Sequence, residues 1–280
     1  MAFGRPVVFV ENFYSVIQFP SHTVAVTENP SANPKERLAN ARRRAADHWT
    51  MTTANTLANI DVTCDRVRGA DCIVLDRGHN LSGEAIKLVG SSDNFTTSED
   101  ILDLTIPSVS SPGGLDDPLG VISEEGAWLK RFDLRAFKYF RFQIAAMGVG
   151  NRPIVVGLQL GLSFESRLYD LPWDDDAGEL LGGSSESSIG WRGRALANVR
   201  RRGTIGIRLE DAIQYDQARY NILGHARRGR PMWIVYDQNQ AANAVLAQLD
   251  EGVHGFRMGR DWWDKRRADV PWVEHEPLLE

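Results

Sequence analysis

The stretch from Asp71 to Asp93, DCIVLDRGHNLSGEAIKLVGSSD, predicts two β-strands joined by a tight polar loop. Residues 73–75 form a short apolar run, and residues 85–89 alternate between apolar and polar side chains. Both patterns are typical of half-buried strands. The loop contains Gly78 and Gly83, and glycine adopts backbone angles that other residues resist. The sequence therefore predicts a rigid hairpin rather than a mobile connection.

Strand patterns continue on both sides of this stretch. Residues 59–64 alternate, and residues 154–164 are expected to form a closing strand. In the segment 130–144, KRFDLRAFKYFRFQI, Phe140, Phe142 and Ile144 share one face. We interpret that aromatic face as core, with stacking on bases or sugar rings as the alternative. The pattern predicts a mainly β, two-layered sandwich.

The order of these segments resembles the discoidin, or galactose-binding-like, β-sandwich. A segment containing Trp49, then a strand, then RGHNL, then a strand ending in Ser-Ser-Asp before an aromatic residue carry the resemblance. Sandwiches with an RGHNL-like connection resemble a module of tail proteins from tailed bacteriophages. The similarity extends along most of the chain, to WVEHEP at residues 272–277. It implies a jelly-roll fold in which the RGHNL loop is architectural and Trp49 closes one end of the core.

The chain, at 280 residues, is longer than one average domain. We expect an amino-terminal strand ribbon (1–20), the sandwich (21–165), a linker (166–190) and a smaller α+β domain (191–280). The ribbon could pair with the carboxy-terminal domain or with a neighbouring subunit. A helix is predicted at residues 210–223, where apolar residues recur at helical spacing before Gly224. Short strands are expected at 232–236, 244–249, 255–258 and 272–274.

Composition limits the class of protein. The chain is 42% hydrophobic and 25% charged with net charge −5, which argues against a general nucleic-acid binder. No apolar run approaches the roughly 20 residues of a membrane helix, so no membrane insertion is expected. The apolar stretch Pro6–Val10 is too short for a signal-peptide core, which favours cytoplasmic synthesis. Cys64 and Cys72 are expected to be buried free thiols, with a disulfide or ligand role as the alternative.

Two segments are strongly charged. Residues 93–128 contain eight acidic residues and no Lys or Arg, and predict a long exposed loop. A solvated or docking surface is favoured over a calcium site because no DxDxDG spacing occurs. Residues 33–44 predict a basic helix capped by Asn33, which we interpret as a solvated face or subunit contact, with phosphate binding as the alternative.

Arginines concentrate between residues 192 and 208. Attraction between this segment and an acidic loop would join identical subunits head to tail, and nucleic-acid contact is the competing interpretation. The candidate assembly contacts are Arg192, Arg194, Arg200, Arg201, Arg202, Asp116, Asp117, Glu124 and Glu125.

Motifs of catalysis are missing from the sequence. It contains no P-loop, no dinucleotide GxGxxG, no GxSxG elbow and no HExxH, and its six histidines are widely spaced. We therefore predict no catalytic residue, no cofactor and no metal. A glycosidase needs only two carboxylates, so with 37 acidic residues a hydrolase stays a third hypothesis. His79 is the most tempting active-site candidate, but we interpret it as a cap for the loop backbone.

The leading hypothesis is a non-enzymatic virion component of a long-tailed phage. It would form a homo-oligomeric ring near the tail tip, contact other tail proteins and be assembled in the host cytoplasm. No specific nucleic-acid partner is expected. The alternative is a carbohydrate-binding module that attaches to host-surface glycans. Its candidate glycan contacts are Trp49, Arg77, His79 and Asn80.

Overall fold

Strands account for nearly all the regular structure in the described part of the computed structural model. That part comprises residues 5–39, 47–108, 113–123, 126–165, 168–169, 179–186, 192–200, 202–209, 222, 231–249 and 266–274. The chain divides into two units. Unit 1 consists of Met1–Glu165, Val235–Ala244 and Pro277–Glu280, and unit 2 of Ser166–Ile234 and Val245–Glu276.

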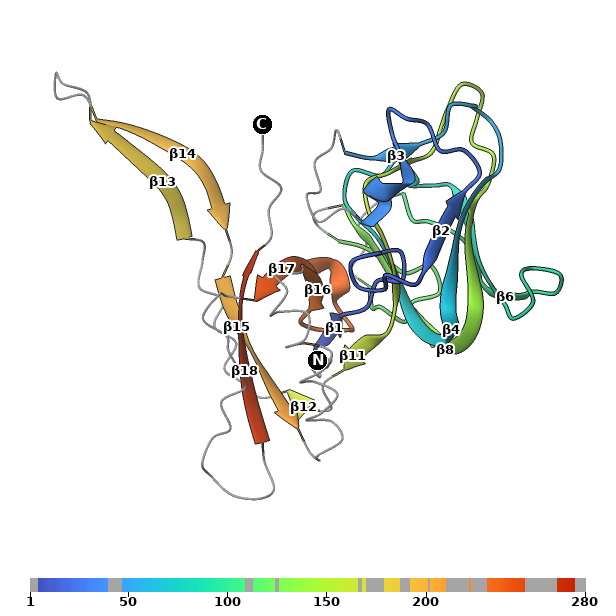
Figure 1. Ribbon diagram of the computed structural model, residues 1–280. Helices are drawn as coiled ribbons and strands as arrows, with labels where there is room; N and C mark the ends of the chain where they lie inside the picture. The colour runs from blue at the N-terminus through green and yellow to red at the C-terminus, as the bar shows by residue number, and fades with distance from the viewer. Residues whose placement is uncertain are drawn as a thin grey trace. The chain divides into compact units, whose positions relative to one another are not determined.

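Unit 1 is built around two long antiparallel strands, β4 (Ala58–Leu75) and β8 (Trp128–Ile144). Their register shifts between Thr63 and Arg68 and again between Ala70 and Cys72. Such irregularities bend a strand, and Figure 1 shows β4 and β8 curving together. The first half of β4 pairs with β2 (Thr23–Val26), and its second half pairs with β10 (Leu158–Gly161). One bent sheet therefore supplies both layers.

A single core lies between these layers. Ile60 and Phe142 come from one half of the long strands, and Ile73 and Trp128 from the other half. All four side chains are fully buried in one hydrophobic cluster. Phe140 also belongs to this cluster, so the interpretation of the aromatic face as core is confirmed. The predicted mainly β sandwich is also confirmed.

The predicted hairpin between residues 71 and 93 is wrong. β5 (Ala85–Ser91) pairs with β8 and with β6 (Glu99–Thr105), and the sheet order is β10-β4-β8-β5-β6. Strand β8 thus lies between β4 and β5, and residues 76–84 connect across it. The backbone of β8 is thus paired along both edges, with β4 on one side and β5 on the other. Alternation identified both strands but could not identify their partner.

The predicted exposed loop at residues 93–128 is also corrected. This segment contains β6 and β7 (Val121–Ile122), and β7 pairs with the start of β8. Ile106 and Leu115 within it are fully buried. These apolar side chains draw the acidic segment back onto the sandwich because their burial stabilises the fold. Residues 109–112 and 124–125 lie outside the described part.

The amino-terminal ribbon belongs to unit 1. β1 (Val7–Phe9) pairs with β11 (Ser163–Glu165), and Gln159 donates hydrogen bonds of 3.1 Å to the carbonyl oxygens of Phe9 and Glu11. Gly161 passes so close to Glu11 that a Cβ there would lie 2.6 Å from its backbone oxygen. This segment is therefore packed directly on the closing strands of the sandwich.

Two smaller elements complete unit 1. β3 (Trp49–Thr50) pairs with β9 (Ile154–Val155), and η3 (Ala241–Asn243) is a short 3-10 turn. The predicted basic helix is a 3-10 helix, η1 (Lys35–Ala39), and residues 40–46 lie outside the described part. The Asn33 side chain accepts a 2.8 Å hydrogen bond from Arg37.

Unit 2 contains the strands that follow residue 165. Glu179–Glu186 forms β13, which pairs with β14 (Arg192–Arg200), so the predicted linker contains a strand. Its glycines and serines suggested flexibility, but pairing with β14 provides the hydrogen bonds that order a polar strand. The other strands are β12 (Leu168–Tyr169), β15 (Arg202–Leu209), β16 (Met232–Val235), β17 (Val245–Leu249) and β18 (Arg266–Glu274).

Three of the four predicted carboxy-terminal strands are confirmed, by β16, β17 and β18. The predicted strand at 255–258 lies outside the described residues, as does the predicted helix at 210–223 apart from Ile222.

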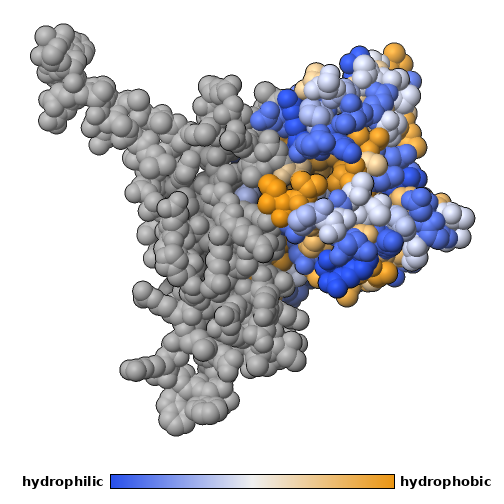
Figure 2. Space-filling view, viewed as in Figure 1, coloured by the Kyte–Doolittle hydropathy of each residue, from blue (hydrophilic) through white to orange (hydrophobic). Residues whose placement is uncertain are grey.

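No helix in the described part of the chain is both long and apolar enough to cross a membrane. On the side of unit 1 seen in Figure 2, a hydrophobic patch lies between hydrophilic residues above and below it.

Both cysteines are free and buried, as predicted. Cys72 donates a hydrogen bond of 3.2 Å to the carbonyl oxygen of Gly161. Burial raises the pKa of the Cys64 thiol to about 12. Both thiols are therefore protonated at neutral pH and are poor nucleophiles.

Candidate functional site

The loop at residues 76–84 holds neighbouring segments in place. The Asn80 amide donates a 2.8 Å hydrogen bond to the carbonyl oxygen of Arg152 and accepts a 2.7 Å bond from the backbone N–H of Ile154. Gly78 and Gly83 have φ of 88° and 81°, as the sequence predicts. Asn80 therefore fastens this loop to the segment before β9, which supports an architectural function.

His79 caps the same loop. Its Nδ1 accepts a 3.1 Å hydrogen bond from the backbone N–H of Leu81, so the neutral ring carries its proton on Nε2. Burial lowers the pKa of His79 to about 4. No nucleophile within hydrogen-bond reach of Nε2 is found among the described residues. The structure thus supports the predicted backbone cap rather than an active-site base.

Trp49 does not offer a surface to a sugar. Its side chain is fully buried in the core cluster, and its Nε1 donates a 3.0 Å hydrogen bond to the carbonyl oxygen of Glu28. The prediction of Trp49 as a glycan contact is therefore wrong, because an aromatic ring must be accessible to stack on a sugar. Arg77 is half-buried at the start of the loop, and its contact with a glycan stays a prediction.

Two of the predicted assembly residues, Asp116 and Asp117, have hydrogen-bond partners within the chain. Asp116 binds Arg131, and Asp117 accepts a 3.0 Å hydrogen bond from the backbone N–H of Gly114. Arg192 and Arg200 on β14 lie opposite Glu186 and Glu179 of β13 in the strand register. Arg194 and Arg202 lie on β14 and β15, whereas Arg201, Glu124 and Glu125 lie outside the described residues.

A cleft of about 620 Å³ lies in unit 1 beside the second half of β4 and the start of β8. This volume is in the range of sites for small ligands. Two basic and four acidic side chains line it, together with an aromatic and an aliphatic side chain. We call it the Arg131 cleft; its lining residues are Asp71, Asp116, Lys130, Arg131, Phe132, Asp133, Leu134, Ser163 and Glu165.

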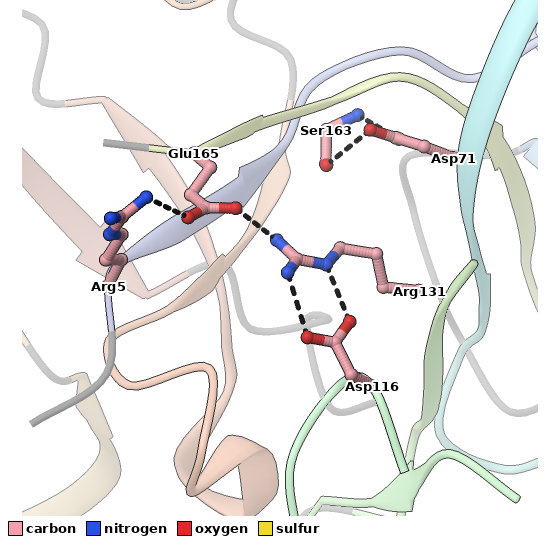
Figure 3. Close-up of polar contacts among 6 residues, drawn as sticks. All are labelled: Arg5, Asp71, Asp116, Arg131, Ser163 and Glu165. Carbon is pink, nitrogen blue, oxygen red and sulfur yellow. Dashed lines mark hydrogen bonds and ion pairs between the residues drawn. The ribbon is translucent and has the colours of Figure 1, made fainter. Parts of the chain in front are cut away.

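Arg131 sets the geometry of this cleft (Figure 3). Its Nε and Nη2 donate to both carboxylate oxygens of Asp116 at 2.8 and 2.9 Å, and its Nη1 donates to Glu165. Glu165 also pairs with Arg5 at 3.0 Å. Burial would lower the pKa of Arg131, but the hydrogen bonds with Asp116 and Glu165 raise it overall. The guanidinium is a fixed support that joins three segments.

The other charged groups of the Arg131 cleft are in different states. Asp71 accepts bonds of 2.6 Å from the backbone N–H and 2.9 Å from the hydroxyl of Ser163; burial nevertheless raises its pKa. Lys130 is only 6% exposed, and burial lowers its pKa. Among the described residues, neither Lys130 nor Asp133 has an ion-pair partner within 4.0 Å. One donor and one acceptor thus stay available for a ligand.

Sequence reasoning did not identify this cleft. Its members come from β4, the segment before β7, the start of β8 and β11. One of them, Glu165, also binds Arg5, which lies 160 residues away in the chain. The only signal in the sequence was the charged beginning, KRFD, of an otherwise aromatic strand. Pairing of β8 with β4 and of β11 with β1 is what brings these side chains together.

Metal binding has no support in the described residues, where no group of three or more His, Cys, Asp or Glu is arranged to hold an ion. The carboxylates of Asp116 and Glu165 form ion pairs with Arg131, and the carboxyl group of Asp71 accepts hydrogen bonds from Ser163. The arrangement is suited instead to hydrogen bonding with an uncharged polar ligand.

Comparison with known proteins shows similarity of structure only. No protein family and no curated protein gives a significant match. Among solved structures, CpGH89CBM32-6 from Clostridium perfringens has 12% identity and TM-score 0.39, over 54% of this chain and 98% of that one. The family 32 carbohydrate-binding module of NanJ from C. perfringens, in complex with galactose, has 11% identity and TM-score 0.38, over 55% and 98%.

A Ruminococcus gnavus GH29 fucosidase in complex with fucose has 10% identity and TM-score 0.38, over 54% of this chain and 26% of that one. All three identities are below 25% and all three TM-scores are below 0.5. These similarities therefore do not assign a ligand or an activity to this chain.

Proposed function

We propose that this chain binds carbohydrate in the Arg131 cleft and does not catalyse a reaction. The observation that carries the proposal is a pair of charged groups, Lys130 and Asp133, that form no ion pair within 4.0 Å among the described residues and lie beside a frame fixed by Arg131. Sugar hydroxyls both donate and accept hydrogen bonds. A hydroxyl accepts from the Lys130 ammonium while another donates to the Asp133 carboxylate. Phe132 and Leu134 supply apolar surface for the C–H face of a sugar ring.

The absence of catalysis is part of the proposal. A glycosidase needs one carboxylic acid free to donate its proton and a second carboxylate opposite it. In the Arg131 cleft, Asp116 and Glu165 are held by Arg131, and both oxygens of Asp71 accept hydrogen bonds from Ser163. These contacts engage the oxygens of all three carboxyl groups. We therefore expect no release of reducing ends from glycans that bind.

The test is a glycan array with the purified chain, followed by calorimetric titration of the sugars that bind. Galactose and fucose, the sugars bound in two of the similar structures, are included as first probes. Lys130→Met conserves most of the side-chain volume and removes the ammonium, and Asp133→Asn removes the acceptor charge. Each should weaken binding about tenfold, the effect of losing a hydrogen bond to a charged group.

Glu36→Gln is the matched control because Glu36 is exposed and lies outside the cleft. Its affinity should equal that of the unmodified chain. An array without any bound glycan, or equal affinity of Lys130→Met and Asp133→Asn with the unmodified chain, would contradict the proposal.

The virion hypothesis, with a ring in the phage tail assembled in the host cytoplasm, also stays a proposal. It depends on arginines of unit 2, of which Arg200 and Arg202 lie on β14 and β15. Reversing charge at Arg200, Arg201 and Arg202 should prevent ring formation and leave a folded monomer. Light scattering of both proteins tests this, and an unchanged oligomer mass counts against the hypothesis.

A further inference from the structure

The outward side chains of β4 and β8 form polar pairs on the surface of the sandwich. Asn59 lies opposite Gln143 and Asp61 opposite Arg141 in the strand register. Gln143 donates a 3.0 Å hydrogen bond to Asn59, and Arg141 donates bonds of 2.7 and 2.8 Å to the two oxygens of Asp61. Successive side chains of a strand point to opposite faces, and Phe142 between them is in the core. These planar polar groups therefore lie on the outer side of the sheet.

The row continues over neighbouring strands. Lys87 of β5 lies opposite Gln143 on one side and opposite Asp103 of β6 on the other. Its ammonium is 2.7 Å from Asp100 and 3.8 Å from Asp103. Neighbouring strands are about 4.8 Å apart, so Asn59, Gln143, Lys87 and Asp103 cover about 14 Å of surface. We call Asn59, Gln143, Lys87 and Asp103, together with Asp61, Tyr139, Arg141 and Phe95, the outer face.

Phe95 occupies an unusual position on the outer face. Its φ is 64°, and that of the preceding Asn94 is 57°, in the left-handed region that a phenylalanine rarely adopts. The Ser91 hydroxyl oxygen stabilises this conformation by accepting a 2.9 Å hydrogen bond from the Phe95 backbone N–H. The ring centroid lies 4.0 Å from Cζ of Arg141 and 6.1 Å from the Tyr139 ring.

This strain does not serve the hydrophobic core, because Phe95 is half-buried and outside the core cluster. The loop instead sets an aromatic ring beside the Asp61–Arg141 pair. Aromatic rings next to planar groups with two hydrogen-bonding atoms match a sugar chain, which presents C–H faces and adjacent hydroxyls. The charges of Asp61, Arg141, Lys87, Asp100 and Asp103 nearly cancel, which favours an uncharged chain over an anionic one.

We propose that the outer face is a second carbohydrate-binding surface, which takes an extended, uncharged polysaccharide along the row from Asn59 to Asp103. This inference deepens the proposed function and rests on it for the ligand class. A flat surface contacts several sugar units weakly, whereas the Arg131 cleft surrounds a short ligand. Long chains therefore bind the outer face, and short sugars bind the cleft.

The experiment is affinity electrophoresis of the full chain in gels containing soluble galactan, glucan or mannan. At least one polysaccharide should retard the unmodified chain. Phe95→Ala and Gln143→Ala should each weaken that retardation about tenfold, because an aromatic contact and its neighbouring hydrogen bonds are lost. Both substitutions are outside the core, and chemical denaturation confirms that each variant is folded.

The variants separate the two sites. Lys130→Met should lose monosaccharide binding but keep retardation by the polysaccharide, whereas Phe95→Ala should show the reverse pattern. Full retardation of both Phe95→Ala and Gln143→Ala, or no retardation of the unmodified chain by any of the three polysaccharides, overturns the outer-face inference. Loss of polysaccharide binding in Phe95→Ala, with Lys130→Met unchanged toward every sugar, would leave this inference standing and overturn the cleft.

Discussion

Asn80 and Arg152, 72 residues apart in the chain, are joined by a 2.8 Å hydrogen bond from the Asn80 amide to the Arg152 carbonyl oxygen. The Asn80 carbonyl oxygen accepts a second bond, of 2.7 Å, from the backbone N–H of Ile154. One side chain thus satisfies two backbone groups at the start of β9. The RGHNL loop stabilises the fold through this contact and does not need a ligand to explain it.

Asn80→Ala should lower the free energy of unfolding by about 1 kcal/mol, because water can replace part of the hydrogen bonding at this exposed position. Urea denaturation measures the change. Ser82→Ala is the matched control, since Ser82 is exposed in the same loop, and it should change stability by less than about 0.5 kcal/mol. Sugar binding should be unchanged in both variants. Loss of sugar binding by a folded Asn80→Ala variant would instead show that this loop contributes to a ligand site.

Gly90→Ala should destabilise the sandwich by about 1–3 kcal/mol through overpacking. A Cβ at Gly90 would lie 2.1 Å from Cδ2 of Phe137. That ring packs edge-on against Phe140, with centroids 6.0 Å apart, so it has little room to move. Thermal or urea unfolding measures the loss, with Gly148→Ala as control because its nearest neighbour would be 3.6 Å away.

A double-mutant cycle with Phe137→Ala isolates the clash. The cost of Gly90→Ala should largely disappear when the Phe137 ring is absent. Equal costs in both backgrounds would show that the ring is not the cause.

His79 should make the fold less stable as pH falls from about 6.5 to about 4. Burial lowers its folded-state pKa to about 4, whereas an unfolded histidine titrates near 6.5. Between these values the unfolded chain binds a proton that the folded chain does not, so unfolding is favoured. Protonation would also replace the acceptor at Nδ1 that binds the Leu81 N–H.

His79→Asn places an amide oxygen near the position of Nδ1 and cannot titrate. Between pH 7.5 and pH 4.5, the unmodified chain should lose up to about 2–3 kcal/mol more stability than this variant. Urea denaturation at both pH values gives the difference. The pKa of His22 is also lowered by burial, but His22 is present in both proteins, so its contribution to the pH dependence of stability is the same in both. Parallel pH dependences would contradict the assignment.

Arg131→Met should lower the free energy of unfolding by about 1–2 kcal/mol, because it leaves Asp116 and Glu165 without their shared cation. The Asp116 side chain is 63% exposed, which keeps the loss below that of a fully buried pair. Arg131→Lys keeps the positive charge but not the two parallel hydrogen bonds to Asp116, so it should lose less stability than Arg131→Met. Denaturation at low salt and at about 1 M salt tests whether the loss is electrostatic. Salt screens charges, so the difference in stability between the unmodified chain and Arg131→Met should be smaller at about 1 M.

Much of unit 1 could be predicted from its sequence. Alternation identified the strands that became β4, β5 and β8, and it assigned Phe140, Phe142 and Ile144 to the core. Gly78 and Gly83 were expected to have unusual backbone angles and do. These features are local, because side-chain period and glycine geometry depend on neighbouring residues.

Other expectations failed because they concerned which strands and side chains contact one another in the folded chain. Strand β8 separates β4 from β5 where a hairpin was expected, and polar residues 179–186 form a strand on β14. Trp49 was expected both to close the core and to meet a glycan, and its complete burial allows only the first. Strand pairing depends on the packing of the whole unit, which a local pattern does not contain.

The sequence by itself determined the class of fold, the core face of the aromatic strand, the free thiols and the rigid turn at Gly78 and Gly83. Only the tertiary structure decided where charged groups meet. The Arg131 cleft gathers side chains from separate segments between Asp71 and Glu165, and the outer face aligns four strands in register. Distances between side chains follow from strand order and bending, and those are properties of the packed chain as a whole.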